Sequence, residues 1–265
     1  MDWHARARAL GYPYTAPDAD CVWSLDGHVP LEGTDVNAVA AALQAAGADP
    51  RAKRTPILAI GSNRAPEQLA RKFYDFPKPA AVILARAWLK DFDVVYGASI
   101  AGYGSIGGAT LTASPGTEIE VWATWLDDAQ LARMHETEGL SSGAYGLFEL
   151  QQINLAFVAG PEWTSALAYV QRCGALNIGG EPAALKEVPA RGRRFQALNQ
   201  RDVQALLRDR FAPGLSVDAF LQENLTSPAM RAARVETLAA NALPFDWPHR
   251  QDRTPASMWP PRPGR

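Results

Sequence analysis

The sequence predicts an α+β protein, because strand patterns and helix patterns occupy different parts of the chain. Between residues 56 and 158, short apolar or alternating runs bounded by turn residues are typical of β-strands. After residue 198, apolar residues recur at helical spacing. The 265 residues are 47% hydrophobic and 20% charged, which indicates a folded protein of one large or two small domains.

The first 55 residues are predicted to form an N-terminal extension. They are rich in loop residues as far as Gly33, and a helix is expected over residues 34–48. Thr34 or Asp35 can cap the start of this helix, and Gly47 suits the position just after its end. Residues 51–55 form a charged linker.

The middle third carries the strand patterns. A buried strand ends at Gly61, and the turn residues Ser-Pro-Gly-Thr at 114–117 lie between two alternating runs, which predicts a hairpin there. The expected strands are 56–60, 80–89, 91–98, 107–113, 118–126 and 146–158.

Helices are expected next to and after the strands. The first spans 127–139, with Asp127 or Asp128 as its cap and Gly139 at its end. The last third predicts helices over 199–211, after a Ser216 cap, and from Pro228, a residue that the first helical turn tolerates. The tail, 244–263, carries six prolines and is expected to be an extended strap or disordered.

Composition excludes several classes of function. The longest apolar runs fall short of the roughly 20 residues of a membrane span, and the N-terminus lacks the apolar core of a secretory signal. A net charge of −2 argues against nucleic-acid binding. Two cysteines and four scattered histidines predict neither a disulfide framework nor a metal site, and a reducing cytoplasm is the expected location.

The first candidate for chemistry is the turn Gly61-Ser62-Asn63, between a buried strand and a helix start. Backbone N–H groups in such a turn point into one concavity and can hold a carboxylate or a developing oxyanion. The alternative is a tight connection with no ligand.

The second candidate is Glu138, in the last turn of the helix that Gly139 ends. The negative end of a helix and burial both raise the pKa of a carboxyl group, which favours proton transfer near neutral pH. A simply exposed glutamate is the alternative, and Glu136 is a competing base. His135 is expected on the surface, and without a Gly-x-Ser-x-Gly turn a triad of Ser62 and His135 is not expected.

Tyr145 is the third candidate, seven residues after Glu138 at the start of a strand. Its phenol could bond the carboxylate or a substrate carbonyl, or it could be packing with a solvated hydroxyl.

The paired glycines Gly107-Gly108 indicate close backbone approach or a bulge. Since no helix follows the glycines of 102–108, a dinucleotide site is not expected.

Taken in order, these segments resemble the γ-glutamylcyclotransferase family. The matching pieces are ILAIGSN, LKDFDVVYG, GGAT with SPG, EVWATWL and MHETEGLSSGAY, within about residues 56–158 and extending to 207. The resemblance implies a small mixed β-barrel with flanking helices. The implied organisation is an extension (1–55), the barrel domain (56–207) and a helical C-terminal extension with a proline-rich tail (208–265).

The resemblance also implies a reaction, in which the α-amine of a γ-glutamyl amide attacks its own γ-carbonyl to give 5-oxoproline and a released amine or amino acid. Glu138 would be the general base and acid, and the 61–63 loop and Tyr145 would bind the substrate. No metal, cofactor, nucleic acid or membrane is implied. Ile60 stands where the family loop has a tyrosine, so a hydroxyl is missing there.

Two alternatives stay open from the sequence, as does the oligomeric state. One is a related cyclase for a larger γ-glutamylated metabolite, with the extensions forming its pocket. The other is a catalytically idle barrel that acts as a binding module. Glu138 on the floor of a pocket, facing the 61–63 amides, favours an enzyme, whereas a pocket plugged by a terminal segment favours the module.

Overall fold

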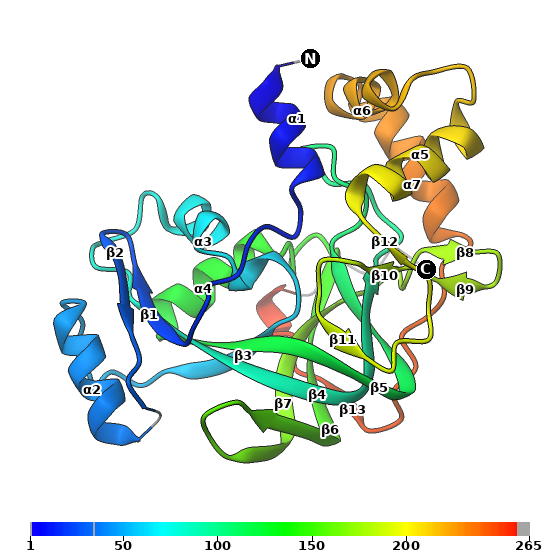
Figure 1. The fold of residues 1–265 in the computed structure, drawn as a ribbon. Helices are drawn as coiled ribbons and strands as arrows, with labels where there is room; N and C mark the ends of the chain where they lie inside the picture. The colour runs from blue at the N-terminus through cyan, green and yellow to red at the C-terminus, as the bar shows by residue number, and fades with distance from the viewer. Residues whose placement is uncertain (1, 34, 259–265) are drawn as a thin grey trace.

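The computed structural model describes residues 2–33 and 35–258 (Figure 1). The helices are α1 (Trp3–Leu10), α2 (Val36–Ala45), α3 (Pro66–Phe73), α4 (Asp128–Thr137), α5 (Gln200–Phe211), α6 (Val217–Thr226) and α7 (Pro228–Ala239), with short 3-10 turns η1 (Ser62–Arg64) and η2 (Ala256–Met258). The longer strands are β3 (Thr55–Ala59), β4 (Val82–Tyr96), β5 (Ala109–Leu126), β6 (Tyr145–Phe157) and β7 (Glu162–Gln171). The shorter strands are β1 (Cys21–Ser24), β2 (Gly27–Pro30), β8 (Asn177–Ile178), β9 (Glu181–Pro182), β10 (Ala184–Leu185), β11 (Ala190–Arg191), β12 (Ala197–Leu198) and β13 (Arg250–Asp252).

The five long strands close into a small barrel. Antiparallel pairing joins β3 to β5, β5 to β4, β4 to β6 and β6 to β7, and the parallel pair β3–β7 completes the ring. One parallel pair among antiparallel ones makes the barrel mixed. The predicted α+β class, with a small mixed barrel, flanking helices and C-terminal helices, is therefore confirmed.

Strand alternation divides the core into two layers. In β3, Leu58 joins the cluster inside the barrel, whereas Ile57 and Ala59 join a second cluster outside it. Helices α3 and α4 cover that outer cluster with Leu69, Phe73 and Met134, among other residues. The two helices are thereby fixed against the outside of the barrel, close to where β3 ends.

The hairpin predicted around residues 114–117 is wrong, because β5 runs through this segment without reversing. Lys90 pairs with Glu118 and Phe92 with Ala113, so the segment 114–117 bulges out opposite one residue, Asp91. Gly116 adopts a left-handed conformation, and its N–H donates to the Asp91 carboxylate at 2.8 Å. The true hairpin joins β4 to β5 through the loop 97–108.

The N-terminal residues extend the barrel's sheet, since β1 pairs with both β2 and β4. Asp35 caps α2 by accepting from the N–H groups of Asn37 and Ala38, and Gly47 after the helix has φ of 76°, as expected. The alternative cap, Thr34, lies outside the described residues. The domain boundaries at 55 and 207 stay predictions.

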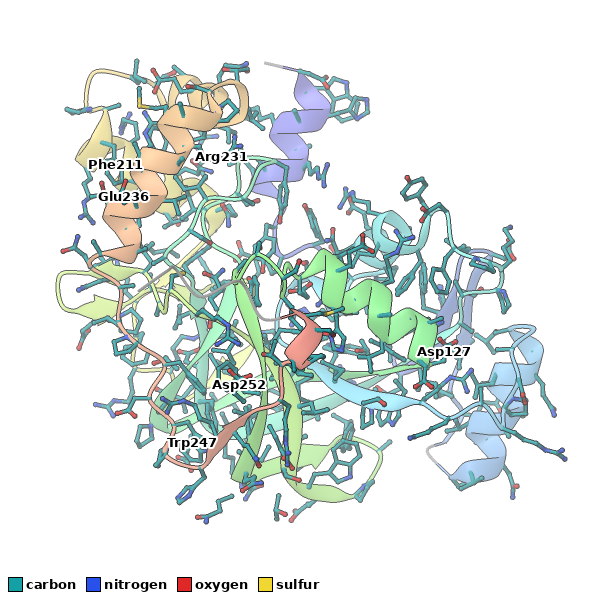
Figure 2. The ribbon with its side chains drawn as sticks, turned by 180° about the vertical axis from the view of Figure 1, so that it is seen from behind. Asp127, Phe211, Arg231, Glu236, Trp247 and Asp252 are labelled. Carbon is teal, nitrogen blue, oxygen red and sulfur yellow. The ribbon has the colours of Figure 1, made fainter. Side chains whose placement is uncertain are left out.

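An extended strap, residues 244–258, follows α7 along the outside of the barrel. Figure 2 shows Trp247 and Asp252 along it, away from Arg231 and Glu236 of α7. Strand β13 pairs with β6, and the Trp247 ring lies 4.6 Å from that of Phe92. The expected tail beyond residue 258 lies outside the described residues. In the part of the chain that the structure describes, no helix has the length and apolar character to cross a membrane.

The loop 97–108 is held by helices from both ends of the chain (Figure 1). Ser105 Oγ donates to the carbonyl of Ala9 at 2.7 Å, and Gln204 Nε2 donates to the carbonyl of Gly104 at 2.7 Å. The fully buried Gln200 side chain bonds both the N–H and the carbonyl of Ile106, at 3.0 and 2.8 Å. Helices α1 and α5 therefore fix the loop's conformation.

Replacing Gln200 with leucine is expected to lower the free energy of unfolding by about 2–4 kcal/mol, because two buried backbone groups of Ile106 lose their partners. Denaturant unfolding followed by tryptophan fluorescence measures the change. Gln196→Leu, at an exposed position, is the control and should change it by under about 0.5 kcal/mol. Equal stability of the two variants would contradict this role of Gln200.

Candidate active site

A cavity of about 410 Å³ opens at one end of the barrel. It lies where β3, β4 and β7 end and β5 and β6 begin, between the 61–63 turn, the loop 97–108 and the end of α4. This volume is in the range of small-molecule sites. Among the described residues, no group of three or more His, Cys, Asp or Glu side chains is arranged to hold a metal ion.

The Gly61-Ser62-Asn63 turn forms one wall of this cavity, directly after β3. None of its three backbone N–H groups donates a hydrogen bond to a residue that the structure describes. The side-chain Oδ1 of Asn63 is buried and accepts none from those residues either. The turn thus brings three backbone donors without a partner among the described residues to the wall of one small cavity.

Glu138 lines the same cavity at the C-cap position of α4. The helix starts at a capping box of Asp127 and Gln130, which confirms Asp127 of the two predicted caps. The Glu138 side chain is 13% exposed, and its Oε1 accepts from Asn63 Nδ2 at 3.1 Å and from Lys72 Nζ. Its Oε2 accepts no hydrogen bond from the described residues.

Lys72 is the cationic partner of Glu138, and sequence analysis missed it. Its side chain, on α3, is 5% exposed, and Nζ also lies 3.3 Å from Met134 Sδ. The signal was present in the sequence, because Lys72 shares the apolar face of α3 with Leu69 and Phe73. A lysine that is buried inside such a stripe requires a partner for its charge.

Glu136 and His135 occupy different surroundings from Glu138. The Glu136 side chain is 76% exposed, pairs with Arg133 and does not line the cavity. The expectation that His135 lies on the surface is wrong: it is buried, and Nδ1 lies 2.7 Å from the hydroxyl of Tyr169 on β7. Burial lowers the pKa of His135. It makes no hydrogen bond with Ser62.

Tyr145 lies in the cavity at the start of β6, but its hydroxyl does not bond Glu138. It donates to the Ala109 carbonyl at 3.4 Å and accepts from Gln171 Nε2 at 2.9 Å. Burial, together with the nearby Tyr12 and Glu138, raises the pKa of Tyr145 well above its usual range. Gly108 makes room for this pair, because a Cβ there would lie 1.8 Å from the Tyr145 hydroxyl.

Tyr12, which sequence analysis also missed, enters the cavity from the N-terminal segment. The residue is 4% exposed, and its hydroxyl accepts from the Ala109 N–H at 2.5 Å. Gly61 allows the approach, since a Cβ there would lie 2.7 Å from that hydroxyl. Burial is the main cause that raises the pKa of Tyr12 well above its usual range, and the negative charge of Glu138 adds to it.

Fold and cavity together define a class: a small closed mixed barrel with a ligand-sized pocket at one end that holds a paired carboxylate. No protein-family model matches the chain, and no curated protein matches it. Among solved structures it is similar to a γ-glutamyl cyclotransferase and to an uncharacterised protein from Homo sapiens. Each match has 17% identity and a TM-score of 0.36, and covers 78% of this chain and 96% of the other. The function proposed below therefore rests on the geometry of the site.

Proposed function

We propose that this protein is a γ-glutamylcyclotransferase-like enzyme that cyclises a small γ-glutamyl amide to 5-oxoproline. One observation carries the proposal: Glu138 lines the same cavity as the 61–63 turn, whose three N–H groups have no partner among the described residues. Such a site offers an acceptor for an amine beside donors for an acyl oxygen, as an intramolecular aminolysis requires.

The free oxygen of Glu138 suits the substrate's α-amino group. Asn63 Nδ2 and Lys72 Nζ both donate to Glu138 Oε1, which leaves Oε2 without a partner among the described residues. An amine held by Oε2 gives up a proton to Glu138, because the neutral amine is the nucleophile and Glu138 is the only carboxylate among the described residues that line the cavity. Glu138 thus acts as general base.

The donors suit the γ-carbonyl. Attack by the amine turns this carbonyl oxygen into an oxyanion, and backbone N–H groups without other partners stabilise such a charge at little reorganisation cost. The N–H groups of Gly61, Ser62 and Asn63 have this role. The loop 97–108, fixed by α1 and α5, encloses the substrate from the other side and keeps amine and carbonyl in contact.

The reaction balances without water or a cofactor. A bond forms between the α-nitrogen and the γ-carbon, and the bond from the γ-carbon to the leaving nitrogen breaks. The proton taken from the α-amine passes through Glu138 to the leaving nitrogen, which departs as an amine or amino acid.

The proposed location of the enzyme is the cytoplasm. Both cysteines of the chain are free, and a reducing compartment such as the cytoplasm would keep them in that state.

The test is release of 5-oxoproline by the full-length protein from glutathione, γ-glutamyl dipeptides and γ-glutamyl amines. Release from any of them, with equimolar amine or amino acid, supports the proposal, and the fastest substrate identifies the leaving group. Absence of release from every compound by folded protein, together with no binding of 5-oxoproline by calorimetry, would refute it and favour a binding module. Binding without release would favour a larger γ-glutamylated substrate.

A further inference from the structure

Tyr12 differs from Tyr145 and Tyr169, two other phenols that border the cavity, because its hydroxyl hydrogen has no acceptor among the described residues. The Tyr145 hydroxyl is engaged by Ala109 and Gln171, and that of Tyr169 by His135. The Tyr12 hydroxyl accepts from the Ala109 N–H and donates to no residue that the structure describes. Its hydrogen is therefore available to a molecule in the cavity.

The surroundings keep that hydrogen in place. Because burial raises the pKa of Tyr12 well above its usual range, the phenol stays protonated at any pH at which the protein works. The bond from the Ala109 N–H, at 2.5 Å, fixes the oxygen, and the ring has little freedom to move because the residue is only 4% exposed. A fixed, protonated phenol is a preorganised donor.

Its position indicates which atom it meets. The hydroxyl lies directly against Gly61, the first residue of the turn that lines the cavity. Asn63, the last residue of that turn, bonds Glu138. The donors of the turn and the Tyr12 hydroxyl thus lie on the Glu138 side of the cavity, where bond making and breaking would occur.

We propose that Tyr12, carried by the N-terminal segment, donates a hydrogen bond to the γ-carbonyl oxygen of the bound substrate and stabilises the oxyanion that forms on it. This inference rests on the proposed cyclisation. It gives the N-terminal residues a direct role in the site, through a hydroxyl that neighbouring Ile60 lacks. The hydroxyl acts alongside the N–H groups of the 61–63 turn.

The experiment pairs a change in the protein with a change in the substrate. Wild type and Tyr12→Phe are compared on the fastest substrate among glutathione, γ-glutamyl dipeptides and γ-glutamyl amines, and on its γ-thioamide. Sulfur accepts hydrogen bonds weakly. We expect Tyr12→Phe to lower kcat about tenfold on the oxygen substrate and less than about threefold on the sulfur substrate. Both substrates are tested with the same protein sample, so any unfolded fraction of the variant lowers both rates equally and does not change their ratio.

The control is Tyr14→Phe, which removes a hydroxyl from the same segment that bonds the Arg8 carbonyl outside the cavity. It should leave both rates within about twofold of wild type. Equal losses on the two substrates in Tyr12→Phe, or no loss, would overturn the role of Tyr12 while leaving the cyclisation standing. No release of 5-oxoproline by wild type would instead overturn the cyclisation, and the role of Tyr12 with it.

Discussion

Glu138→Gln is expected to lower kcat for 5-oxoproline release by about 10³-fold, within the range that a positioned general base contributes. Glutamine keeps the size of the side chain and its bond from Lys72, but it cannot take a proton from the α-amine or return one to the leaving nitrogen. The measurement is steady-state release of 5-oxoproline from the fastest substrate, with KM determined alongside. We expect most of the loss to fall on kcat, since the N–H groups of the 61–63 turn still hold the acyl oxygen of the substrate.

The matched control is Glu136→Gln, two residues earlier on the same helix. Its side chain is 76% exposed and lies outside the cavity, so the variant should keep kcat within about twofold of wild type. If instead Glu138→Gln stays active while folded, as judged by its circular dichroism, then Glu138 is not the base. Loss of activity in Glu136→Gln alone would move that role to Glu136.

Local patterns predicted much of the barrel and half of the candidate site. Three predictions needed only residues a few positions apart: the strand at 56–60, its end at Gly61, and Asp127 as the cap of α4. The structure agrees with all three. Asp127 fixes where α4 begins and Gly139 fixes where it ends, so together they determine that Glu138 is the carboxylate at its end. The structure then brings Glu138, Tyr145 and the 61–63 turn into one cavity, while their roles stay predictions.

The remaining side chains could not be found this way, because tertiary packing brings them in. Tyr12 bonds Ala109, 97 residues away, and Lys72 bonds Glu138, 66 residues away. Nothing local to Tyr12 distinguishes it from a loop tyrosine. The hairpin predicted at 114–117 was wrong for a related reason. The turn residues do form a local irregularity, but whether the strand reverses or bulges there depends on Asp91 in the strand opposite.

Lys72→Met is expected to lower kcat/KM for 5-oxoproline release by about 100-fold, the size of effect that misplacing a reacting group by about 1 Å can have. Methionine fills the same apolar position beside Met134, but Glu138 loses the cation that holds its carboxylate in place. Removing one partner of a nearly buried ion pair should also lower the free energy of unfolding by about 3 kcal/mol. The measurements are kcat/KM on the fastest substrate and denaturant unfolding of the same variant.

Two further variants separate charge from packing. Lys72→Arg keeps the positive charge and should recover most of the lost kcat/KM. Lys78→Met removes an exposed lysine paired with Asp26 and should leave both kcat/KM and stability unchanged, because exposed pairs contribute little. A loss of stability in Lys72→Met without a loss of kcat/KM would mean that the ion pair only holds α3 against α4. A loss of kcat/KM in Lys72→Met that Lys72→Arg restores would make Lys72 the group that positions Glu138 in the cavity.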